Sequence, residues 1–362
     1  MLVNSVALLQ YTRCVLRAWG MPETDAELTA RLLVETDLRA IDSHGVSMLA
    51  MYEGMVQKGS LNMQAQRRIE RDTPVVALID ADAGLGHPVA YEAMTLACDK
   101  AIACGLGAVG VHNSHHFGAA GLYAELASQR GLLGLVTSSA RTVAVLPTHG
   151  ATPMLGTNPI AFAAPALRHP AVLLDMATST VALNKVKVHA LNKLPIPAGW
   201  VVDGKGDMVL DAQRAFELCK KQLDGGLLPL GGVSDTGGHK GYGLALLAQL
   251  LGSTLVGGSF SPLRQARQGR DAKDNIGHFF LAIDPKAFRL PGLFEADVDD
   301  IVDALHGTKR AAPEVPVQIP GEPELAARAE RAIAGIPIPD DLMQQLRAIA
   351  TRAAVPFSID VQ

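Results

Sequence analysis

The chain has 362 residues, a length that suggests about two domains or one large α/β unit. It carries 32 Lys and Arg against 36 Asp and Glu, so it has no basic surplus for binding a nucleic-acid backbone. Mean hydropathy is +0.19, yet no run of about 20 apolar residues predicts a membrane span, and charged residues interrupt any signal-peptide core. We therefore expect a cytoplasmic protein without nucleic-acid or membrane partners.

Helical periodicity alternates with short β-branched runs, the pattern of an α/β protein. Residues 24–27 match a capping box and predict a helix that ends near 42–45. The next expected elements are a strand at 75–80, a turn at 81–86, a helix at 88–104, a strand at 108–111, a helix at 119–129 and a strand at 132–137. The last three form a strand–helix–strand unit, which usually makes a parallel pair.

The composition changes in the middle of the chain, where residues 147–170 are rich in Gly, Pro and Thr. This loop leads into an expected strand at 171–175. Further along we expect a helix at 211–223, a glycine-dense loop at 225–238, an apolar helix starting near Lys240, a strand at 276–284, and two Ala-rich helices from Glu322 onward, separated by residues 336–339. No internal repeat or low-complexity tract is present.

The four cysteines form no C-x-x-C pair, and three of them lie among apolar residues with a helical pattern. We expect Cys14, Cys98, Cys104 and Cys219 to be reduced, buried thiols rather than a disulfide framework or a zinc site.

Two glycine-rich segments look like nucleotide motifs but have the wrong context. Residues 105–110 match G-x-G-x-x-G, but a helix precedes them and a strand follows, so Gly105 is expected to cap the helix. Gly232 and Gly237 have the Walker spacing, but Lys240 comes too late and Gly241 replaces the hydroxyl residue. What remains is a lysine at a helix start, which either attracts an anion or is simply solvated.

The histidines leave several interpretations open. His112, His115 and His116 suit a metal site, packing in a loop or core, or a substrate or cofactor loop. No nearby Glu or Cys completes an H-E-x-x-H type of metal set. His44 follows Ser43, whose hydroxyl can fix the imidazole tautomer for general acid catalysis, although a histidine at a helix end also suits the helix dipole.

Six segments occur in one order along the chain: Asp-Ser-His-Gly at 42–45, Asn-Ser-His-His-Phe-Gly at 113–118, Leu-Gly-Thr-Asn-Pro at 155–159, Leu-Asp-Met-Ala-Thr at 174–178, Gly-His-Lys-Gly-Tyr-Gly at 238–243, and Ile-Pro-Gly-Glu at 319–322. In these segments the chain resembles the malate/L-lactate dehydrogenase family, which is unrelated to the Rossmann-type dehydrogenases. That family includes ureidoglycolate dehydrogenase, 2,3-diketo-L-gulonate reductase, sulfolactate dehydrogenase and piperideine-2-carboxylate reductase. The match covers nearly the whole chain.

The resemblance implies a non-Rossmann α/β fold with a mixed sheet and flanking helices. It also implies an NAD(P)-dependent oxidoreductase that transfers a hydride between NAD(P)H and a small 2-keto or 2-hydroxy acid, with NAD slightly preferred. A homodimer with its active site near the subunit interface is expected, and no metal. By resemblance, His44 is the proton donor, Ser43 orients it, His116 is a second active-site histidine, and Thr157 contacts substrate. The implied cofactor residues are Leu174, Asp175, Met176, Ala177, Thr178, His239, Lys240, Gly321, Glu322 and Pro323.

One position departs from the family pattern. Many relatives carry an arginine where this chain has Met48, and that arginine can hold the substrate carboxylate; Tyr52 is retained. We expect Arg141 to replace it, or the substrate to have a different tail. The alternatives are a reductase of a cyclic imino acid (pyrroline-2-carboxylate or piperideine-2-carboxylate) and an inactive homologue that acts as a binding protein.

The motifs also suggest a discontinuous architecture. We expect residues 1–75 and 285–362 to form one mainly helical unit around an α/β cofactor-binding unit at 76–284.

Overall fold

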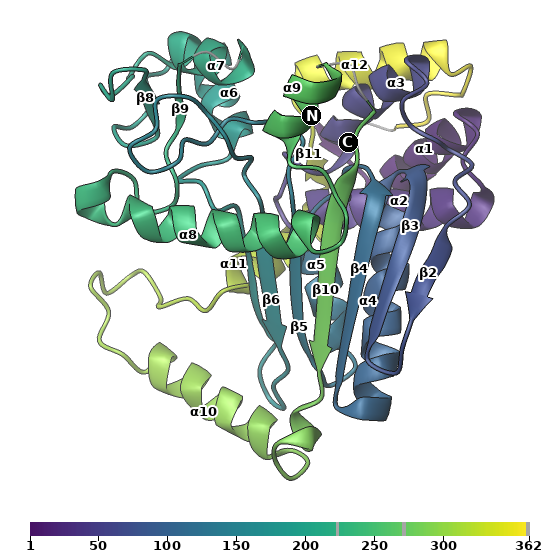
Figure 1. Ribbon diagram of the computed structural model, residues 1–362, viewed down its shortest axis with the longest axis vertical. Coiled ribbons are helices and arrows are strands. Elements are labelled where there is room, and N and C mark those ends of the chain that lie inside the picture. The colour runs from purple at the N-terminus through teal and green to yellow at the C-terminus, as the bar shows by residue number, and fades with distance from the viewer. Residues whose placement is uncertain (222–223, 270–272, 360–362) are drawn as a thin grey trace.

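The computed structural model describes residues 1–221, 224–269 and 273–359, and its centre is a seven-stranded mixed sheet (Figure 1). Across the sheet the strands are β2 (Arg68–Asp72), β3 (Val76–Gly84), β4 (Leu106–Ser114), β10 (Ile276–Ile283), β5 (Leu133–Ser138), β6 (Ile160–Ala164) and β7 (Val172–Met176). Only β3 and β4 pair in parallel, and the other neighbouring pairs are antiparallel. The expected mixed α/β sheet with flanking helices is confirmed.

Helices cover both faces of the sheet (Figure 1). Helices α4 (Gly86–Cys104) and α5 (Gly121–Ser128) pack on one face, while α8 (Gly238–Gln249) and the π-helical turn η3 (Leu250–Thr254) cross the other. Gly107 in β4 allows α4 to approach closely, because a Cβ there would lie 2.1 Å from the carbonyl oxygen of Ala97. The main apolar core lies between the sheet and α4 and α5.

A second core joins the two ends of the chain. It is built from α1 (Ser5–Ala18), α2 (Glu23–Leu38), η1 (Val46–Met48), α3 (Leu49–Gln57) and α12 (Asp340–Arg352). Strand β1 (Leu2–Val3) pairs with β11 (Ile336–Pro337), and α11 (Glu322–Ala334) packs on α2. The proposed boundaries at residues 75 and 285 stay a prediction.

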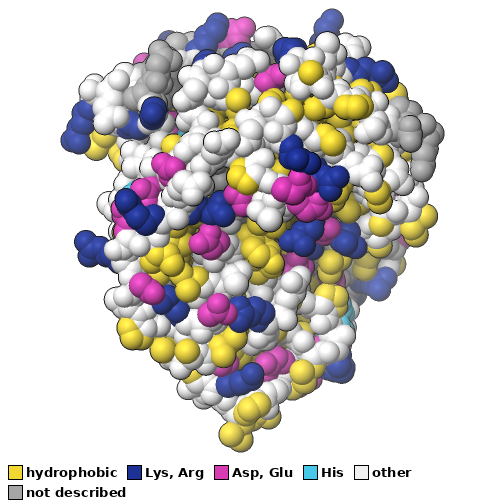
Figure 2. Space-filling model, turned by 90° about the vertical axis from the view of Figure 1, so that its right-hand side faces the viewer, with side chains coloured by type: hydrophobic (Ala, Val, Ile, Leu, Met, Phe, Trp, Pro, Cys, Tyr) yellow, Lys and Arg dark blue, Asp and Glu magenta, His cyan; other side chains and the backbone are white. Residues whose placement is uncertain are grey.

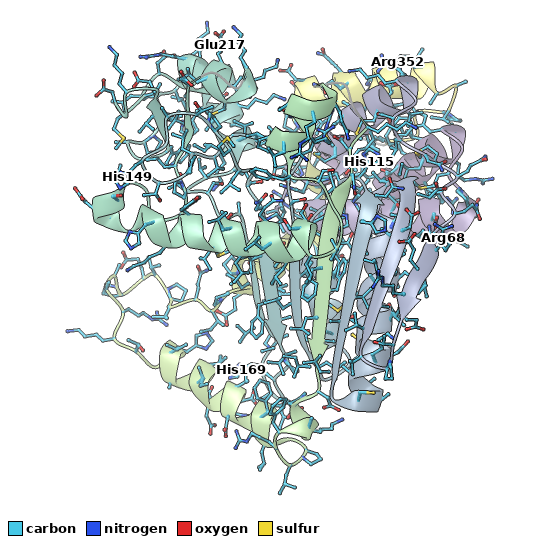
Figure 3. The ribbon with its side chains drawn as sticks, viewed as in Figure 1. Arg68, His115, His149, His169, Glu217 and Arg352 are labelled. Carbon is cyan, nitrogen blue, oxygen red and sulfur yellow. The ribbon has the colours of Figure 1, made fainter. Side chains whose placement is uncertain are left out.

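A third core supports a smaller lobe at the upper left of Figure 1. It contains α6 (Leu183–Leu191), β8 (Val201–Asp203), α7 (Ala212–Lys221) and β9 (Gly225–Leu227). The remaining elements are η2 (Ser234–Thr236), α9 (Ser261–Gln268), η4 (Pro285–Ala287) and α10 (Leu293–His306). Helix α10 lies at the opposite end of the molecule, near His169 (Figure 3).

Most expected elements are present. The structure confirms the helices at 88–104 and 119–129, the strands at 108–111, 132–137, 171–175 and 276–284, the helix near Lys240 and the two C-terminal helices. The helix expected at 211–223 is observed through Lys221, and residues 222–223 lie outside the described residues. Gly105 caps α4 with a φ of +85°, as expected.

Four local predictions were wrong. Thr24 lies inside α2 and makes no cap, because the N-cap is Pro22 and the helix ends at Leu38. The expected turn at 81–86 is partly strand, since β3 continues to Gly84 through an irregular pairing. Strands β4 and β5 do not pair, because β10 lies between them and bonds to both. Of the cysteines, Cys98 and Cys219 are buried, but Cys104 is exposed and Cys14 only partly covered.

The edge strand β2 carries charge rather than an apolar face. Figure 2 views the molecule from that side, and Lys and Arg side chains are interspersed there with Asp and Glu. Arg67 pairs with Asp25 and Glu92, and Arg68 with Glu70. Such charges discourage another strand from pairing with the edge. Within the described residues, none of the helices has the length and apolarity needed to cross a bilayer.

Candidate active site

The expected site residues lie on loops that meet at one edge of the sheet. Strands β3, β4, β5 and β7 end at this edge, and β6 and β10 begin there, as the pairings Ile276–Ser114 and Ile160–Met176 show. Figure 3 marks the place with His115, at the upper end of β4 and β10. The mixed sheet thus brings together segments that are more than 60 residues apart in the chain.

Two histidines from separate elements stack at this edge. The rings of His44 and His116 have centroids 5.4 Å apart and an interplanar angle of 28°. His44 Nδ1 lies 2.7 Å from the Ser43 hydroxyl, and His116 Nδ1 lies 2.6 Å from the Tyr52 hydroxyl. Within the described residues neither Nε2 atom has a hydrogen-bond partner. Each ring is therefore oriented through Nδ1 and keeps Nε2 for another group.

The protein environment of His44 and His116 favours the neutral form of both imidazole rings. Burial lowers the pKa of His44, and burial together with the neighbouring His44 and His87 lowers the pKa of His116 well below 6.5. Tyr52 is fully buried, which raises its pKa well above 10. At neutral pH the cluster accordingly contains neutral imidazoles beside a neutral phenol, and a neutral imidazole can take up a proton.

A third histidine was missed by the sequence analysis. His87, in the first turn of α4, is 1% exposed, and its ring makes T-shaped contacts with Tyr52 and His116 at 6.0 and 6.4 Å. In the described part of the chain neither of its ring nitrogens has a hydrogen-bond partner, and burial lowers its pKa to about 3. The only sequence signal was a histidine in the glycine-rich stretch after β3, which has no motif of its own.

The loop that carries His44 is fixed by a buried carboxyl. Asp37, at the end of α2, accepts a hydrogen bond from the backbone N–H of Val46 at 2.8 Å. Burial raises the pKa of Asp37 to about 8. Gly45 lies directly against this carboxyl, because a Cβ built there would be 1.9 Å from Asp37 Oδ1. The glycine of the Ser-His-Gly motif therefore serves close packing.

Replacing Gly45 with alanine should destabilise the protein and displace His44. Fitting a methyl group into a packed site costs about 1–3 kcal/mol, and here the clash is with the Asp37 carboxyl. We expect a lower midpoint in urea denaturation and a reduced rate of turnover. As a control, Gly59→Ala meets no atom within 4 Å but has a φ of +65°, so it reports backbone strain without a clash. Equal stability of Gly45→Ala and the native chain would contradict the packing argument.

The expected substrate residues occupy different environments. The backbone oxygen of Thr157 accepts the N–H of Thr178, while Tyr52 holds His116. Met48 is half-buried and packs on the helical core. The Arg141 Nε lies 2.6 Å from Asp274, and the terminal nitrogens of this half-exposed guanidinium have no hydrogen bond within the described part of the chain. Arg141 thus keeps donors that a carboxylate can use.

The three expected cofactor segments, residues 174–178, 239–240 and 321–323, are connected in space. The backbone N–H of Leu173 donates to the oxygen of Pro320, which places the last segment beside β7. At the other end of β7, Leu230 N–H donates to Thr178, and Gly241 packs on Leu230. His239 and Lys240 are exposed in the first turn of α8, and Lys240 has no ion pair within the described residues.

Two side chains in these segments have structural partners. The Thr178 hydroxyl is buried and donates to the backbone oxygens of Thr157 and Asn158. Glu322 accepts the backbone N–H of Ile319 and pairs with His306 at 2.9 Å. The polar side-chain groups of both residues are therefore engaged within the protein, and their backbone atoms remain for a ligand.

Two hollows lie on either side of Leu173. The smaller one is lined by Arg39, Ile41, Ala119, Gly121, Leu122, Leu173, Asp175 and Glu324. The larger, of about 280 Å³, is lined by residues of α5, the 165–171 loop, Gly321 and Leu325. Asp175 accepts the backbone N–H of Gly121 at 2.7 Å. Desolvation of its carboxyl nevertheless raises its pKa to about 6. In the described part of the chain, no three His, Cys, Asp or Glu side chains come together as a metal site.

Comparison with known protein families gives one full-length match. The family model for malate/L-lactate dehydrogenase matches residues 3–347. The chain belongs to the malate/L-lactate dehydrogenase family. The malate dehydrogenase of Pyrococcus abyssi is 37% identical, over 96% of this chain and 94% of the relative. The L-sulfolactate dehydrogenase of Methanothermobacter thermautotrophicus is 32% identical, over 95% of both chains.

Solved structures agree with this assignment. Malate dehydrogenase from Entamoeba histolytica superimposes with a TM-score of 0.93 at 29% identity, covering 98% of this chain and 99% of that one. The Δ1-piperideine-2-carboxylate reductase from Pseudomonas syringae gives a TM-score of 0.83 at 27% identity, over 97% and 100% of the two chains. The non-Rossmann fold expected from the motifs is thereby confirmed. This fold accordingly occurs both in enzymes named for hydroxy acids and in one named for a cyclic imino acid.

Proposed function

We propose that the protein transfers a hydride between NAD(P)H and a small 2-keto acid or its 2-hydroxy partner, with NAD slightly preferred over NADP. The observation that carries this proposal is the stacked pair His44 and His116, each with Nδ1 held by a hydroxyl group and Nε2 left for substrate. The relatives named malate and sulfolactate dehydrogenase support the class of substrate.

The reaction requires one hydride and one proton. In reduction, R–CO–COO⁻ with NAD(P)H and H⁺ gives R–CHOH–COO⁻ and NAD(P)⁺. The nicotinamide cofactor supplies the hydride, or takes it up in the reverse direction. The protein must therefore deliver the proton to the carbonyl oxygen, or remove it from the hydroxyl group.

His44 is the proposed proton carrier, at its Nε2 atom. Ser43 fixes the ring through Nδ1, and His116, held by Tyr52, forms the adjacent wall. Because burial lowers the pKa of His44, its neutral form is ready to accept the hydroxyl proton during oxidation. In reduction the protonated ring is needed, and it is more populated at lower pH.

The residues present fit a dinucleotide cofactor. The start of α8 offers backbone N–H groups and Lys240, which makes no ion pair with any residue that the structure describes; both suit a pyrophosphate. Gly231 and Gly238 let the loop before α8 close tightly on itself, since a Cβ at either would clash with backbone atoms of the facing segment. The backbone of residues 174–178 and 321–323, together with His239, would line the rest of the binding cleft.

The substrate carboxylate needs a cation, and we propose Arg141 for this role. It follows β5 at the same edge of the sheet, and its terminal nitrogens have no hydrogen bond within the described residues. Thr157, beside Thr178, is the proposed contact to the rest of the substrate. Met48 packs on the helical core and offers no charge to a substrate carboxylate.

Two alternative functions follow from particular observations. Reduction of a cyclic imino acid uses the same hydride and proton, and the likeness to piperideine-2-carboxylate reductase supports it. An inactive homologue that only binds ligand would explain Met48, but it leaves the ordered His44, His116 and Tyr52 cluster without a use.

A substrate panel separates these functions. Purified protein is assayed with NADH and NADPH in parallel, against pyruvate, oxaloacetate, sulfopyruvate and pyrroline-2-carboxylate. We expect turnover of one or more 2-keto acids and weaker turnover of the imino acid. Turnover of the imino acid alone would establish the first alternative. Cofactor binding without turnover of any substrate would support the second.

Replacing Lys240 with methionine should weaken cofactor binding. Loss of a hydrogen bond to a charged group costs about 1.5–3 kcal/mol, which corresponds to a dissociation constant roughly 10- to 100-fold higher. Fluorescence titration with NADH measures this constant. Lys286→Met is the matched control, because Lys286 lies in η4, beyond the opposite end of β10. Equal affinities of the two variants would remove Lys240 from the proposed cofactor site.

We also propose a cytoplasmic homodimer. Four leucines on α8 and its continuation are exposed, namely Leu244, Leu247, Leu250 and Leu255. A row of exposed apolar side chains is typical of a surface that binds another protein. Light scattering on the intact chain tests this assembly.

A further inference from the structure

One arginine of α11 holds the loop that carries Ser43 and His44. Arg331 Nη1 donates to the backbone oxygen of Asp37 at 2.6 Å, and both terminal nitrogens reach the carboxylate of Asp42. Only 16% of its side chain is exposed. The guanidinium therefore binds the last turn of α2 and the residue immediately before Ser43 with one rigid fork.

The same helix begins in an expected cofactor segment. Helix α11 starts at Glu322, directly after Gly321, which lies against Leu173 of β7. Glu324 lines the smaller hollow together with Asp175 and Ile41. A helix transmits position along its length because each turn is hydrogen-bonded to the next. Helix α11 is thus a direct connection between the proposed cofactor cleft and the histidine loop.

Other contacts also hold the loop. The Ser47 hydroxyl donates to the Asp42 backbone oxygen at 2.6 Å, and the His44 N–H donates to the Ile41 oxygen at 2.9 Å. Asp37 holds Val46 from the side of α2, and Asn184 of α6 donates to the Ser43 backbone oxygen at a longer 3.3 Å. None of these contacts involves α11. Arg331 alone, among the described residues, links Asp42 to the helix that starts at the cofactor segment.

We propose that Arg331 is a positioning residue, which aligns His44 with the bound cofactor by clamping Asp42 and the end of α2 to α11. The proposal rests on the proposed proton transfer by His44. Catalysis is sensitive to such alignment, because a displacement of about 1 Å can cost roughly 100-fold in rate. Arg331 would act through Asp37 and Asp42, the residues that its guanidinium contacts.

Arg328 provides a matched control on the same helix. It lies one turn before Arg331 and pairs with Glu35 of α2 at 2.7 Å, so it also joins α11 to α2. It makes no contact with the loop at 41–45. Any effect that comes only from weaker packing of α11 on α2 should therefore appear in both variants.

The experiment compares Arg331→Gln, Arg331→Lys and Arg328→Gln in the full chain. For Arg331→Gln we expect kcat to fall at least about tenfold with an unchanged NADH dissociation constant. Arg331→Lys should recover part of the loss, because lysine keeps the charge but not the fork. Arg328→Gln should keep the native kcat. In a double-mutant cycle with Asp42→Asn, the two losses should not add.

A second measurement does not depend on activity. Proton NMR titration of the histidine rings reports the pKa of His44, which burial lowers in the native protein. Release of the loop in Arg331→Gln should raise this pKa toward 6.5, and Arg328→Gln should leave it unchanged. Equal kcat values and equal His44 titrations in the two glutamine variants would overturn the proposal. If the native chain is active and a His44 variant is equally active, the proposed proton transfer by His44 is wrong instead.

Discussion

Replacing His44 with alanine is expected to lower kcat by about 10²- to 10⁴-fold, the usual contribution of a positioned general acid or base. The residue stacks on His116 and is oriented by Ser43, so its removal takes away the proposed proton carrier. Steady-state assays with the best 2-keto acid, and with its 2-hydroxy partner in reverse, measure the loss. Cofactor binding should be unchanged, because the proposed cofactor segments do not contain His44.

The pH dependence of the rate provides a second test of the role of His44. The pKa of His44 is lowered, so the neutral base persists below pH 6.5, and the acid limb of hydroxy-acid oxidation should lie below that value. This limb should disappear in His44→Ala. The control, Ser43→Ala, should keep the limb but lower the rate less, since the ring remains. A His44→Ala enzyme with the native rate would refute the role, and a loss found only in His116→Ala would transfer it to His116.

The two buried histidines His87 and His278 should each subtract from the stability of the protein as the pH falls below 6.5, because both must remain neutral in the folded chain. Burial lowers the pKa of both His87 and His278 to about 3. Protonation therefore favours the unfolded chain, where the pKa is about 6.5. The stabilisation is complete above pH 6.5 and is lost as the pH falls toward 3, at about 1.4 kcal/mol per pH unit for each group. Over two pH units the two histidines together account for roughly 5 kcal/mol. The raised pKa values of Asp37 and Asp175 offset part of this loss, because the folded chain binds their protons more tightly than the unfolded chain.

Urea denaturation at pH 7, 6 and 5 measures this loss. In His87→Leu the free energy of unfolding should depend less steeply on pH, by the uptake of about one proton on unfolding. The substitution removes one of these histidines without breaking a hydrogen bond to a described residue. His278 is less suitable for substitution, because its ring bonds to the hydroxyls of Ser138 and Ser114. The control is His149→Leu, at an exposed histidine, which should keep the native slope. A slope unchanged by His87→Leu would show that His87 is not the acid-sensitive group.

The local elements were largely predictable because short-range patterns specify them. Gly105 ends α4 as expected, since a glycine readily adopts the positive φ of a helix C-cap. The capping box at Thr24 failed because Pro22 is the N-cap and the helix begins at Glu23, one residue before Thr24. The strand–helix–strand pairing failed because β10, more than 100 residues later, inserts between β4 and β5.

The sequence by itself determined the family and the mixed α/β class, because six short motifs keep their order. The tertiary structure alone decided their surroundings. His87 and Asp37 have no motif, and only burial shifts their pKa values; Arg331 becomes important only because α11 packs on α2. Such effects arise from contacts between residues distant in sequence. Desolvation and hydrogen bonding depend on these contacts, which no local pattern encodes.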